Sequence, residues 1–421
     1  MRAHGLVILS VLTCGGQAQA PPTVRPGVEV LLSDSLRLVH GQRLGLLTNQ
    51  TGVDAAGRRD VDRLLADGLR LVALFSPEHG FRGAEDRPGL PDAIDSATHL
   101  PIYSLFGGSR TAATQALDSI DVLLIDLQDI GARFYTYPAT ATQLMGDAAA
   151  RGKRVVVLDR PDPVGGDVVQ GNVRPVIGDP DKDFVGFLPV PMRHGMTLGE
   201  LLRLTNDALA LHADLTVVPA AGWHRGVSYD STGLPWIKPS PNMPSLESAF
   251  HYPGTCLFEG TNLSVGRGTE EAFQVVGAPW IDVRRILAAL PAQALEGVAV
   301  TAADFTPHAP TDGKYGDVPL HGVRLRVTDR SHYDPTRLAV ALLVALRAVH
   351  PDSFRIRAEW FDVLAAGPEL RLAIDSGRTA PEIWAAGPTR SHNFSGVAPS
   401  TCFTEGLPFA CSRAPVTFPR L

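Results

Sequence analysis

The chain has 421 residues, of which 44% are hydrophobic and 19% charged, with a formal net charge of −6 at pH 7. Such a length exceeds one small domain, so we expect two domains. The composition is that of a well-packed soluble enzyme and argues against a disordered or nucleic-acid-binding protein, because a negative chain has no general affinity for polyanions. An anionic substrate must therefore be bound by local arginines.

Residues 1–20 have the features of a secretory signal peptide. Leu6–Thr13 is apolar but too short to span a bilayer, and Ala18–Ala20 offers a small-residue cleavage site. We therefore expect export to a bacterial periplasm and no membrane span later in the chain. A lipoprotein anchored at Cys14 is the less favoured alternative, because Thr13 stands where a smaller residue is typical.

Three cysteines follow the predicted signal peptide, so they do not form a complete disulfide framework. Cys402 and Cys411 could bridge in an oxidising compartment. Buried free thiols are the equally good alternative.

Between residues 43 and 218, short apolar runs alternate with helical stretches. Strands are predicted at residues 44–47, 69–75, 102–105, 122–127 and 154–158, and helices at 60–66, 111–117 and 138–151. This alternation indicates an α/β domain with a parallel, doubly wound sheet.

The second half of the chain is less regular. A capping box predicts a helix that begins at Thr197, and residues 222–253, rich in Pro, Gly and Ser, are expected to be an extended connection. We place the domains at residues 25–242 and 243–421. The latter is expected to be a smaller α+β domain, whose clearest helix runs from Asp334 to about Val349.

Polar side chains follow the predicted strands of the first domain. The most informative segment is Ser76–Gly83, which offers the carboxylate of Glu78, an imidazole and a guanidinium directly after a buried strand. In open α/β sheets, ligands bind at the carboxyl ends of the strands. We expect these loops to converge on one rim and to bring together Asn49, Glu78, His79, Arg82, Asp126, Asp129, Arg133, Tyr135 and Asp159.

Carboxylates, arginines, amides and aromatics in one site suit a polar, ring-shaped ligand such as a sugar. A carboxylic acid can protonate a glycosidic oxygen, and an arginine can bind a substrate carboxylate with two hydrogen bonds. The alternative is a set of structural ion pairs, for example Glu78 with Arg82 or Asp129 with Arg133. The glycine-rich stretch 260–268 fits neither a Walker loop nor a dinucleotide fingerprint, and no metal motif stands out, so we expect no cofactor and no metal.

Several long motifs resemble the bacterial exo-β-N-acetylmuramidase (NamZ-like) family, formerly a domain of unknown function. They are the segments at residues 45–52, 75–83, 126–137, 158–161, 194–197, 239–242, 252–255, 259–262 and 277–280. The resemblance implies a Rossmann-like catalytic domain, a smaller C-terminal domain and an active-site cleft between them. It also implies release of terminal N-acetylmuramic acid (MurNAc) from the non-reducing ends of peptidoglycan fragments, with Glu78 as the catalytic glutamate.

The remaining site residues are predicted with this chemistry in view. His79, Asp126 and Asp129 are the other catalytic candidates. Arg82, Arg133 and Arg267 are candidates for binding the lactyl carboxylate that distinguishes MurNAc from N-acetylglucosamine (GlcNAc). The substrate-binding set is completed by Asn49, Tyr135, Asp159, His194 and Asn262.

Two other functions remain open at this stage. One is a non-catalytic sugar- or muropeptide-binding protein, which is favoured by Val265, since the family usually has a glutamate there. The other is a metallohydrolase that uses His79, Asp126 and Asp129, or His194, although their spacing matches no standard metal motif.

Overall fold

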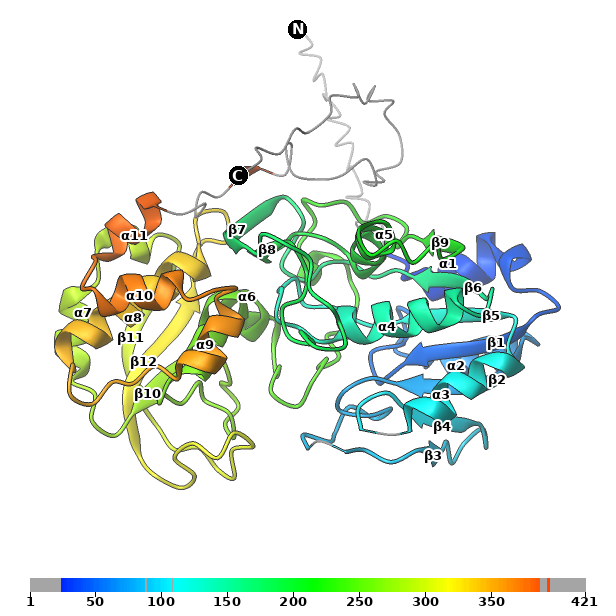
Figure 1. The fold of residues 1–421 in the computed structure, drawn as a ribbon, viewed down its shortest axis with the longest axis horizontal. Helices are drawn as coiled ribbons and strands as arrows, with labels where there is room; N and C mark the ends of the chain where they lie inside the picture. Colours follow the sequence, from blue (N-terminus) through cyan, green and yellow to red (C-terminus); the bar gives the residue numbers. More distant parts are fainter. Residues whose placement is uncertain (1–23, 88, 108, 387–391, 394–421) are drawn as a thin grey trace, which may run out of the picture.

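Seven strands form the central sheet of the N-terminal part, in the order β3-β4-β2-β1-β5-β6-β9 (Figure 1). The computed structural model describes residues 24–87, 89–107, 109–386 and 392–393. All neighbouring strands pair in parallel except β3, a short antiparallel edge strand that the sequence pattern missed. The strands are β1 (Arg43–Thr48), β2 (Arg70–Ser76), β3 (Ala93–Ile94), β4 (Pro101–Ser104), β5 (Val122–Asp126), β6 (Arg154–Leu158) and β9 (Leu215–Val218).

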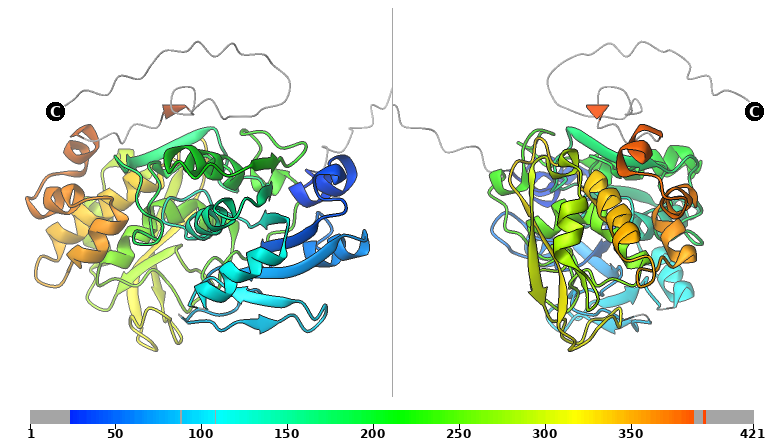
Figure 2. Two further views of the ribbon diagram at one scale, coloured as in Figure 1. Left: turned by 45° about the vertical axis from the view of Figure 1, so that its right-hand side comes forward. Right: turned by 90° about the vertical axis from the view of Figure 1, so that its left-hand side faces the viewer.

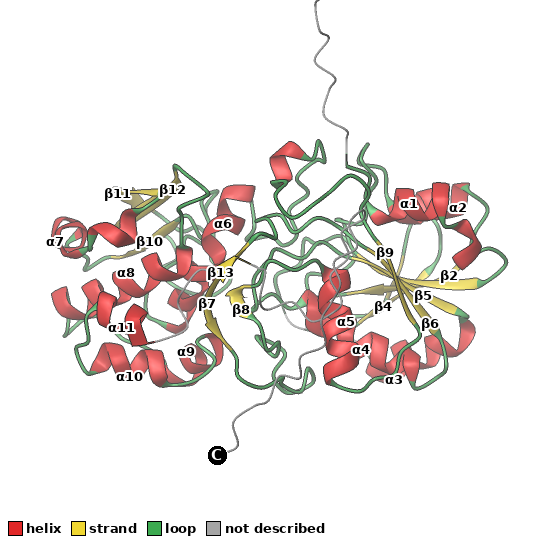
Figure 3. Ribbon diagram, turned by 90° about the horizontal axis from the view of Figure 1, so that it is seen from above, coloured by secondary structure: helices red, strands yellow, loops and turns green. Residues whose placement is uncertain are grey.

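Helices cover both faces of this sheet, as Figure 3 shows from above. One face carries α1 (Gly27–Asp34) and α2 (Asp60–Ala66), and the other carries α3 (Arg110–Ala116), α4 (Tyr137–Ala149) and α5 (Leu198–Ala208). Alternating side chains of the strands explain this layering, because successive residues point to opposite faces. Leu44 and Leu46 belong to the core on the α1–α2 side, whereas Leu47 belongs to the core on the other side. The predicted doubly wound α/β fold is confirmed.

The C-terminal part is built on a three-stranded antiparallel sheet, β10-β12-β11. Helices pack beside it, and a further three-stranded sheet, β13-β7-β8, lies near the junction with the N-terminal part (Figures 1 and 2). The elements are β7 (Val168–Val173), β8 (Pro191–Arg193), α6 (Leu246–Thr255), β10 (Val275–Ala278), α7 (Val283–Ala289), β11 (Val298–Phe305), β12 (Leu320–Val327), α8 (Pro335–Val349), α9 (Ala358–Leu364), α10 (Glu369–Asp375), α11 (Ala380–Ala386) and β13 (His392–Asn393).

Most predicted elements agree with the structure to within one or two residues. The capping box at Thr197 and the cap of α8 by Asp334 are both present. The prediction of an extended connection over 222–253 is wrong at its end, because α6 begins at Leu246. Ser245 caps that helix by accepting a hydrogen bond from the N–H of Ser248.

Some predictions cannot be compared with the structure. The signal peptide at 1–20, Cys14, Cys402 and Cys411 lie outside the described residues, and the domain boundary at 242/243 stays a prediction. Within the described ranges, no helix combines the length and the apolar character that a bilayer span requires. Cys256 is a buried free thiol.

Candidate active site

The segment after β2 forms a tight turn that presents Glu78. The N–H of Gly80 donates to the carbonyl of Pro77 at 3.0 Å. His79 has φ of 69°, a left-handed conformation that is uncommon outside glycine and that clusters at functional sites. Glu78 is partly exposed, and its Oε2 accepts a hydrogen bond of 2.6 Å from the hydroxyl of Thr136, the residue that precedes α4. One carboxyl oxygen is thus oriented by the protein.

Glu78 opens into a cleft of about 180 Å³ between the two parts of the chain. The lining mixes charged groups with aromatic surface, and Trp360 is 40% exposed. Such a lining suits a polar ring, since aromatic faces pack on the apolar side of a sugar. Its principal residues are Glu78, His79, Tyr135 and Thr136 from the N-terminal part, Asn242 from the connection, and Glu259, Arg267, Phe273 and Trp360 from the C-terminal part.

Asp86 connects the loop that follows Glu78 to the other side of the cleft. Its Oδ2 accepts hydrogen bonds from Asn242 and Thr311, and lies 3.7 Å from Nη1 of Arg267. Its Oδ1 lies 3.6 Å from Nδ1 of His79. The Nδ1–H of His79 donates to the carbonyl of Glu85 at 2.8 Å, because a carbonyl can only accept. Asp86 therefore fixes the loop that follows Glu78 against the C-terminal part.

Glu259 and Arg267 form an ion pair on the C-terminal wall of the cleft, with Nη2 of Arg267 2.6 Å from Oε1 of Glu259. Burial alone would lower the pKa of Arg267, but Glu259 more than offsets burial and holds that pKa above its ordinary value. Lys314 stabilises the loop from behind by donating to the carbonyls of Glu259 and Leu263. Burial lowers the pKa of Lys314 to about 8.

Sequence reasoning missed Glu259, Asp86, Thr136 and Trp360 as cleft residues. Glu259 and Thr136 lie inside motifs that the resemblance already contained, so a search for further carboxylates in those motifs would have found Glu259. Asp86 and Trp360 carry no such signal.

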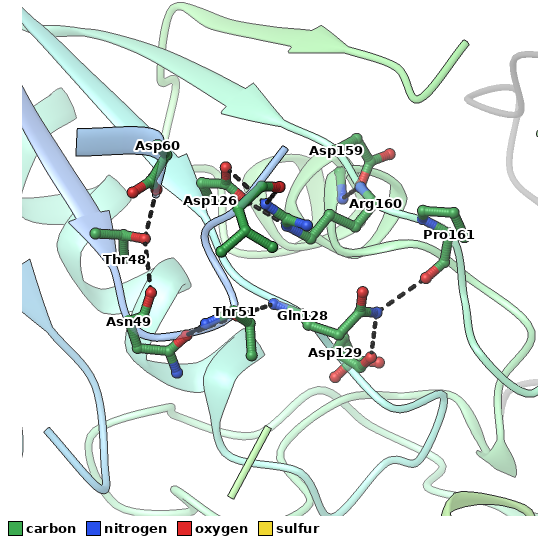
Figure 4. Close-up of polar contacts among 12 residues, drawn as sticks. Thr48, Asn49, Thr51, Asp60, Asp126, Gln128, Asp129, Asp159, Arg160 and Pro161 are labelled. Carbon is green, nitrogen blue, oxygen red and sulfur yellow. Dashed lines mark hydrogen bonds and ion pairs between the residues drawn. The ribbon is translucent and has the colours of Figure 1, made fainter. Parts of the chain in front are cut away.

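A second polar network occupies the interior beside β1 and β5 (Figure 4). Arg160 donates to both carboxylate oxygens of Asp126, with Nη2 to Oδ2 at 3.0 Å, and also to the carbonyl of Val53 at 2.8 Å. Asp126 is fully buried and Arg160 is 5% exposed. Burial lowers the pKa of Arg160, but Asp126 more than offsets this effect. Burial, reinforced by the neighbouring carboxylate of Asp126, raises the pKa of Asp60 well above its ordinary value.

Asp129 and His194 form another interior group, next to Asp162. Nε2 of His194 lies 3.3 Å from Oδ2 of Asp129, and its Nδ1 accepts from the N–H of Met196. Burial raises the pKa of Asp162 to about 7, with His194 opposing and Asp129 reinforcing the effect. The pKa of His194 is also raised: burial would lower it, but Asp129 more than compensates.

The Asp162 group makes the stability of the fold depend on pH. An unfolded aspartate releases its proton near pH 4, whereas folded Asp162 holds it to about pH 7. Its contribution to stability is therefore full below about pH 4 and is lost as the pH rises through 7. We expect the free energy of unfolding of the wild type to fall, between pH 5 and 8, by a few kcal/mol more than that of Asp162→Asn. Urea unfolding across this pH range measures the difference, and parallel pH curves would contradict it.

The expectation that all strand-end side chains meet at one cleft is wrong. Of the predicted site residues, Glu78, His79, Tyr135 and Arg267 line the cleft. Asp126, Asp129 and His194 lie in the interior groups described above, and Asn49 is buried, donating to the hydroxyl of Tyr137. The catalytic roles of Asp126 and Asp129 stay predictions without support from their placement.

The other predicted binding residues are likewise engaged elsewhere. Arg133 is buried and donates to the carbonyls of Asn172, Val190 and Leu364 rather than pairing with Asp129, and burial lowers its pKa to about 9. Arg82 pairs with Asp95 at 2.8 Å and not with Glu78.

Two more of these residues anchor neighbouring elements. Asp159 accepts hydrogen bonds from Thr197 and Gly199 at the start of α5, and burial raises its pKa to about 6. Asn262 exchanges hydrogen bonds with the backbone of Ser353 and Arg355. Substrate binding by these four residues stays a prediction.

The chain matches the N-terminal domain of exo-β-N-acetylmuramidase NamZ over residues 44–247 and the C-terminal domain over residues 250–398. It belongs to the NamZ family. The resemblance found in the motifs is thus confirmed, and the two matched segments correspond to the two parts of the fold that enclose the cleft.

Relatives of known sequence or structure agree with this assignment. A peptidoglycan β-N-acetylmuramidase NamZ from Bacillus subtilis is 38% identical over 389 residues, which cover 90% of this chain and 92% of that protein. Crystal structures of two DUF1343 family proteins from Bacteroides fragilis superpose with TM-scores of 0.76 and 0.68. Each is 32% identical, and each comparison covers 87% of this chain and 94% of the other.

Val265, the departure from the usual NamZ sequence, is fully buried in the hydrophobic core. Its side chain is not among those that line the cleft between the described parts of the chain. Because the side chain of Val265 packs in the core, this position gives no reason to expect a non-catalytic protein.

Proposed function

We propose that this NamZ family member is an exo-acting peptidoglycan β-N-acetylmuramidase in which Glu78 is the general acid. The observation that carries the proposal is the position of Glu78, partly exposed at the interdomain cleft with one oxygen oriented by Thr136. The substrate is a peptidoglycan fragment with MurNAc at its non-reducing end. Release of free MurNAc from the disaccharide MurNAc–GlcNAc by the purified protein tests the function directly.

The reaction follows from the groups around the bond. Protonated Glu78 would deliver its proton to the glycosidic oxygen as the bond to the sugar breaks, so that the GlcNAc side leaves as a neutral alcohol. Positive charge then develops on the MurNAc ring, where an ionised carboxylate stabilises it. Water adds to the anomeric carbon and releases a proton, which gives free MurNAc and lets Glu78 regain its acid form. Asp86 and Glu259 are the carboxylates that line the cleft beside Glu78 in the described part of the chain.

Arg267 is the candidate for recognising the lactyl carboxylate of MurNAc. It lines the cleft, its side chain is 19% exposed, and it lies over the ring of Phe273 at 5.4 Å, which fixes its direction. A charge-assisted hydrogen bond is worth about 1.5–3 kcal/mol. We expect Arg267→Gln to lower the preference for 4-nitrophenyl MurNAc over 4-nitrophenyl GlcNAc, measured as the ratio of kcat/KM values, by roughly 10- to 100-fold.

Arg267→Lys is the matched control, since it keeps the charge but not the planar pair of donors. It should retain part of the preference. An equal loss of kcat/KM on both substrates would mean that Arg267 stabilises the cleft through its ion pair with Glu259 and does not bind the lactyl carboxylate.

Export to the periplasm accompanies this function, because peptidoglycan lies outside the cytoplasmic membrane. The predicted signal peptide at residues 1–20 supports this proposal. Fractionation of cells that produce the full-length chain, with detection of the mature N-terminus by mass spectrometry, distinguishes cleavage after Ala20 from lipidation at Cys14.

A further inference from the structure

A second cavity, of about 260 Å³, lies beside the cleft and is formed by the N-terminal part alone. We call it the side groove; it is lined by Ser104, Phe106, Arg110, Thr140, Gln143 and Phe184, among others. The two cavities share their supporting elements. Ser104 pairs in register with Ser76, two residues before Glu78, and Phe184 is followed by Val185, which lines the cleft.

Helix α4 makes the same connection. Thr136, which donates to Glu78, and Thr140, which lines the side groove, lie one helical turn apart, and the N–H of Thr140 donates to the carbonyl of Thr136 at 3.1 Å. Glu78 lines the cleft, together with Arg267 and Trp360 of the C-terminal part, and the side groove begins one helical turn farther along α4, toward β4 and α3.

The side groove has an aromatic wall. The rings of Phe106 and Phe184 stack with centroids 6.0 Å apart and an interplanar angle of 28°, and both side chains are partly exposed. Partly exposed aromatic rings at a groove offer a surface on which the C–H face of a pyranose can pack.

The remaining wall is polar and carries more negative than positive charge. Arg110 pairs with Asp181 and lies 3.4 Å from Asp147, while the amide of Gln143 donates to Asp181 at 2.9 Å. One arginine against two aspartates leaves a formal charge of −1, which disfavours an anionic occupant. Hydrogen-bonding groups without a net positive charge suit a neutral ligand that carries hydroxyl and N-acetyl groups.

We propose that the side groove binds the neutral N-acetylhexosamine on the leaving-group side of the scissile bond. This inference rests on the proposed function. If MurNAc occupies the cleft between Arg267 and Glu78, the bond to be broken lies at Glu78, and the next sugar extends away from the C-terminal part. We assign the side groove to this sugar because it is formed by the N-terminal part alone, one turn of α4 from Thr136, and because its charge suits GlcNAc better than a second lactyl sugar.

The test compares two substrates that share MurNAc but differ in the leaving group. MurNAc–GlcNAc needs the side groove, whereas MurNAc β-fluoride, whose leaving group is a single atom, does not. We expect Phe184→Ala to lower kcat/KM for MurNAc–GlcNAc by about tenfold and to leave kcat/KM for the fluoride within about twofold. Phe106→Ala should behave in the same way. Unchanged hydrolysis of the fluoride also shows that each variant is folded.

Leu372→Ala is the matched control. It truncates an apolar side chain that is 54% exposed on α10, away from both cavities, and should change neither substrate. An equal loss on both substrates in Phe184→Ala and Phe106→Ala, or no loss on either, would overturn the leaving-group site. Failure of the wild type to hydrolyse both substrates would instead overturn the proposed function, so the two outcomes are distinct.

Discussion

Glu78→Gln is expected to hydrolyse MurNAc–GlcNAc about a hundred to ten thousand times more slowly than the wild type, the range typical of losing a general acid. Glutamine keeps the size and the hydrogen bond from Thr136 but has no acidic proton to transfer. The KM for the disaccharide should change little, because the carboxyl group acts mainly in the transition state. Steady-state release of MurNAc measures both constants.

A substrate with an activated leaving group separates acid catalysis from other roles of Glu78. 2,4-Dinitrophenolate leaves without protonation, so Glu78→Gln should hydrolyse 2,4-dinitrophenyl MurNAc much closer to the wild-type rate. Thr136→Val is the matched control, since it removes the orienting hydroxyl but not the acid and should lose far less activity. Wild-type turnover of MurNAc–GlcNAc by Glu78→Gln would refute the assignment.

Asp126→Asn is expected to destabilise the protein by about 3–5 kcal/mol, although Asp126 lies outside the cleft. The substitution leaves the guanidinium of Arg160 charged, 5% exposed and without its carboxylate partner. An uncompensated buried charge is costly, whereas the ion pair itself contributes little net stability. Urea unfolding monitored by circular dichroism measures the change.

The double variant Asp126→Leu/Arg160→Met provides the comparison. Because it removes both charges, its loss of stability should be smaller than the sum of the two single losses. A loss below about 1 kcal/mol in Asp126→Asn would show that water or another group compensates Arg160.

The fold was largely predictable because strands such as β6, which is apolar from Val155 to Leu158, are bounded by polar turns. Glu78 was predictable for the same reason, since a strand end followed by a glycine-rich turn projects its polar residues toward one edge. Asp126 ends β5 and Asp159 follows β6, yet their side chains bind Arg160 and the start of α5. Local sequence predicts that a residue lies at the edge of the sheet. It does not predict which neighbouring group forms a hydrogen bond or an ion pair with that residue.

The contacts across the cleft, between its N-terminal and C-terminal walls, were the least predictable. Trp360 and Asp86 reach the cleft only because the two parts pack together, and nothing in their own sequence neighbourhood indicates it. Glu259 is an intermediate case, because its motif was recognised but its ion pair with Arg267 depends on how the loop folds.

The interior network of Figure 4 has a consequence for protein engineering. β1 has β2 on one side and β5 on the other, and the crevice at this reversal of strand order is where sheets of this type commonly hold their ligands. Here the buried Asp126 and Arg160 pair with each other, and Arg160 also donates to the carbonyl of Val53. Attempts to alter sugar specificity should therefore leave this crevice intact and exchange the loops at residues 79–87 and 259–267, where grafted sequences would reshape the substrate surface while the scaffold beneath them stays whole.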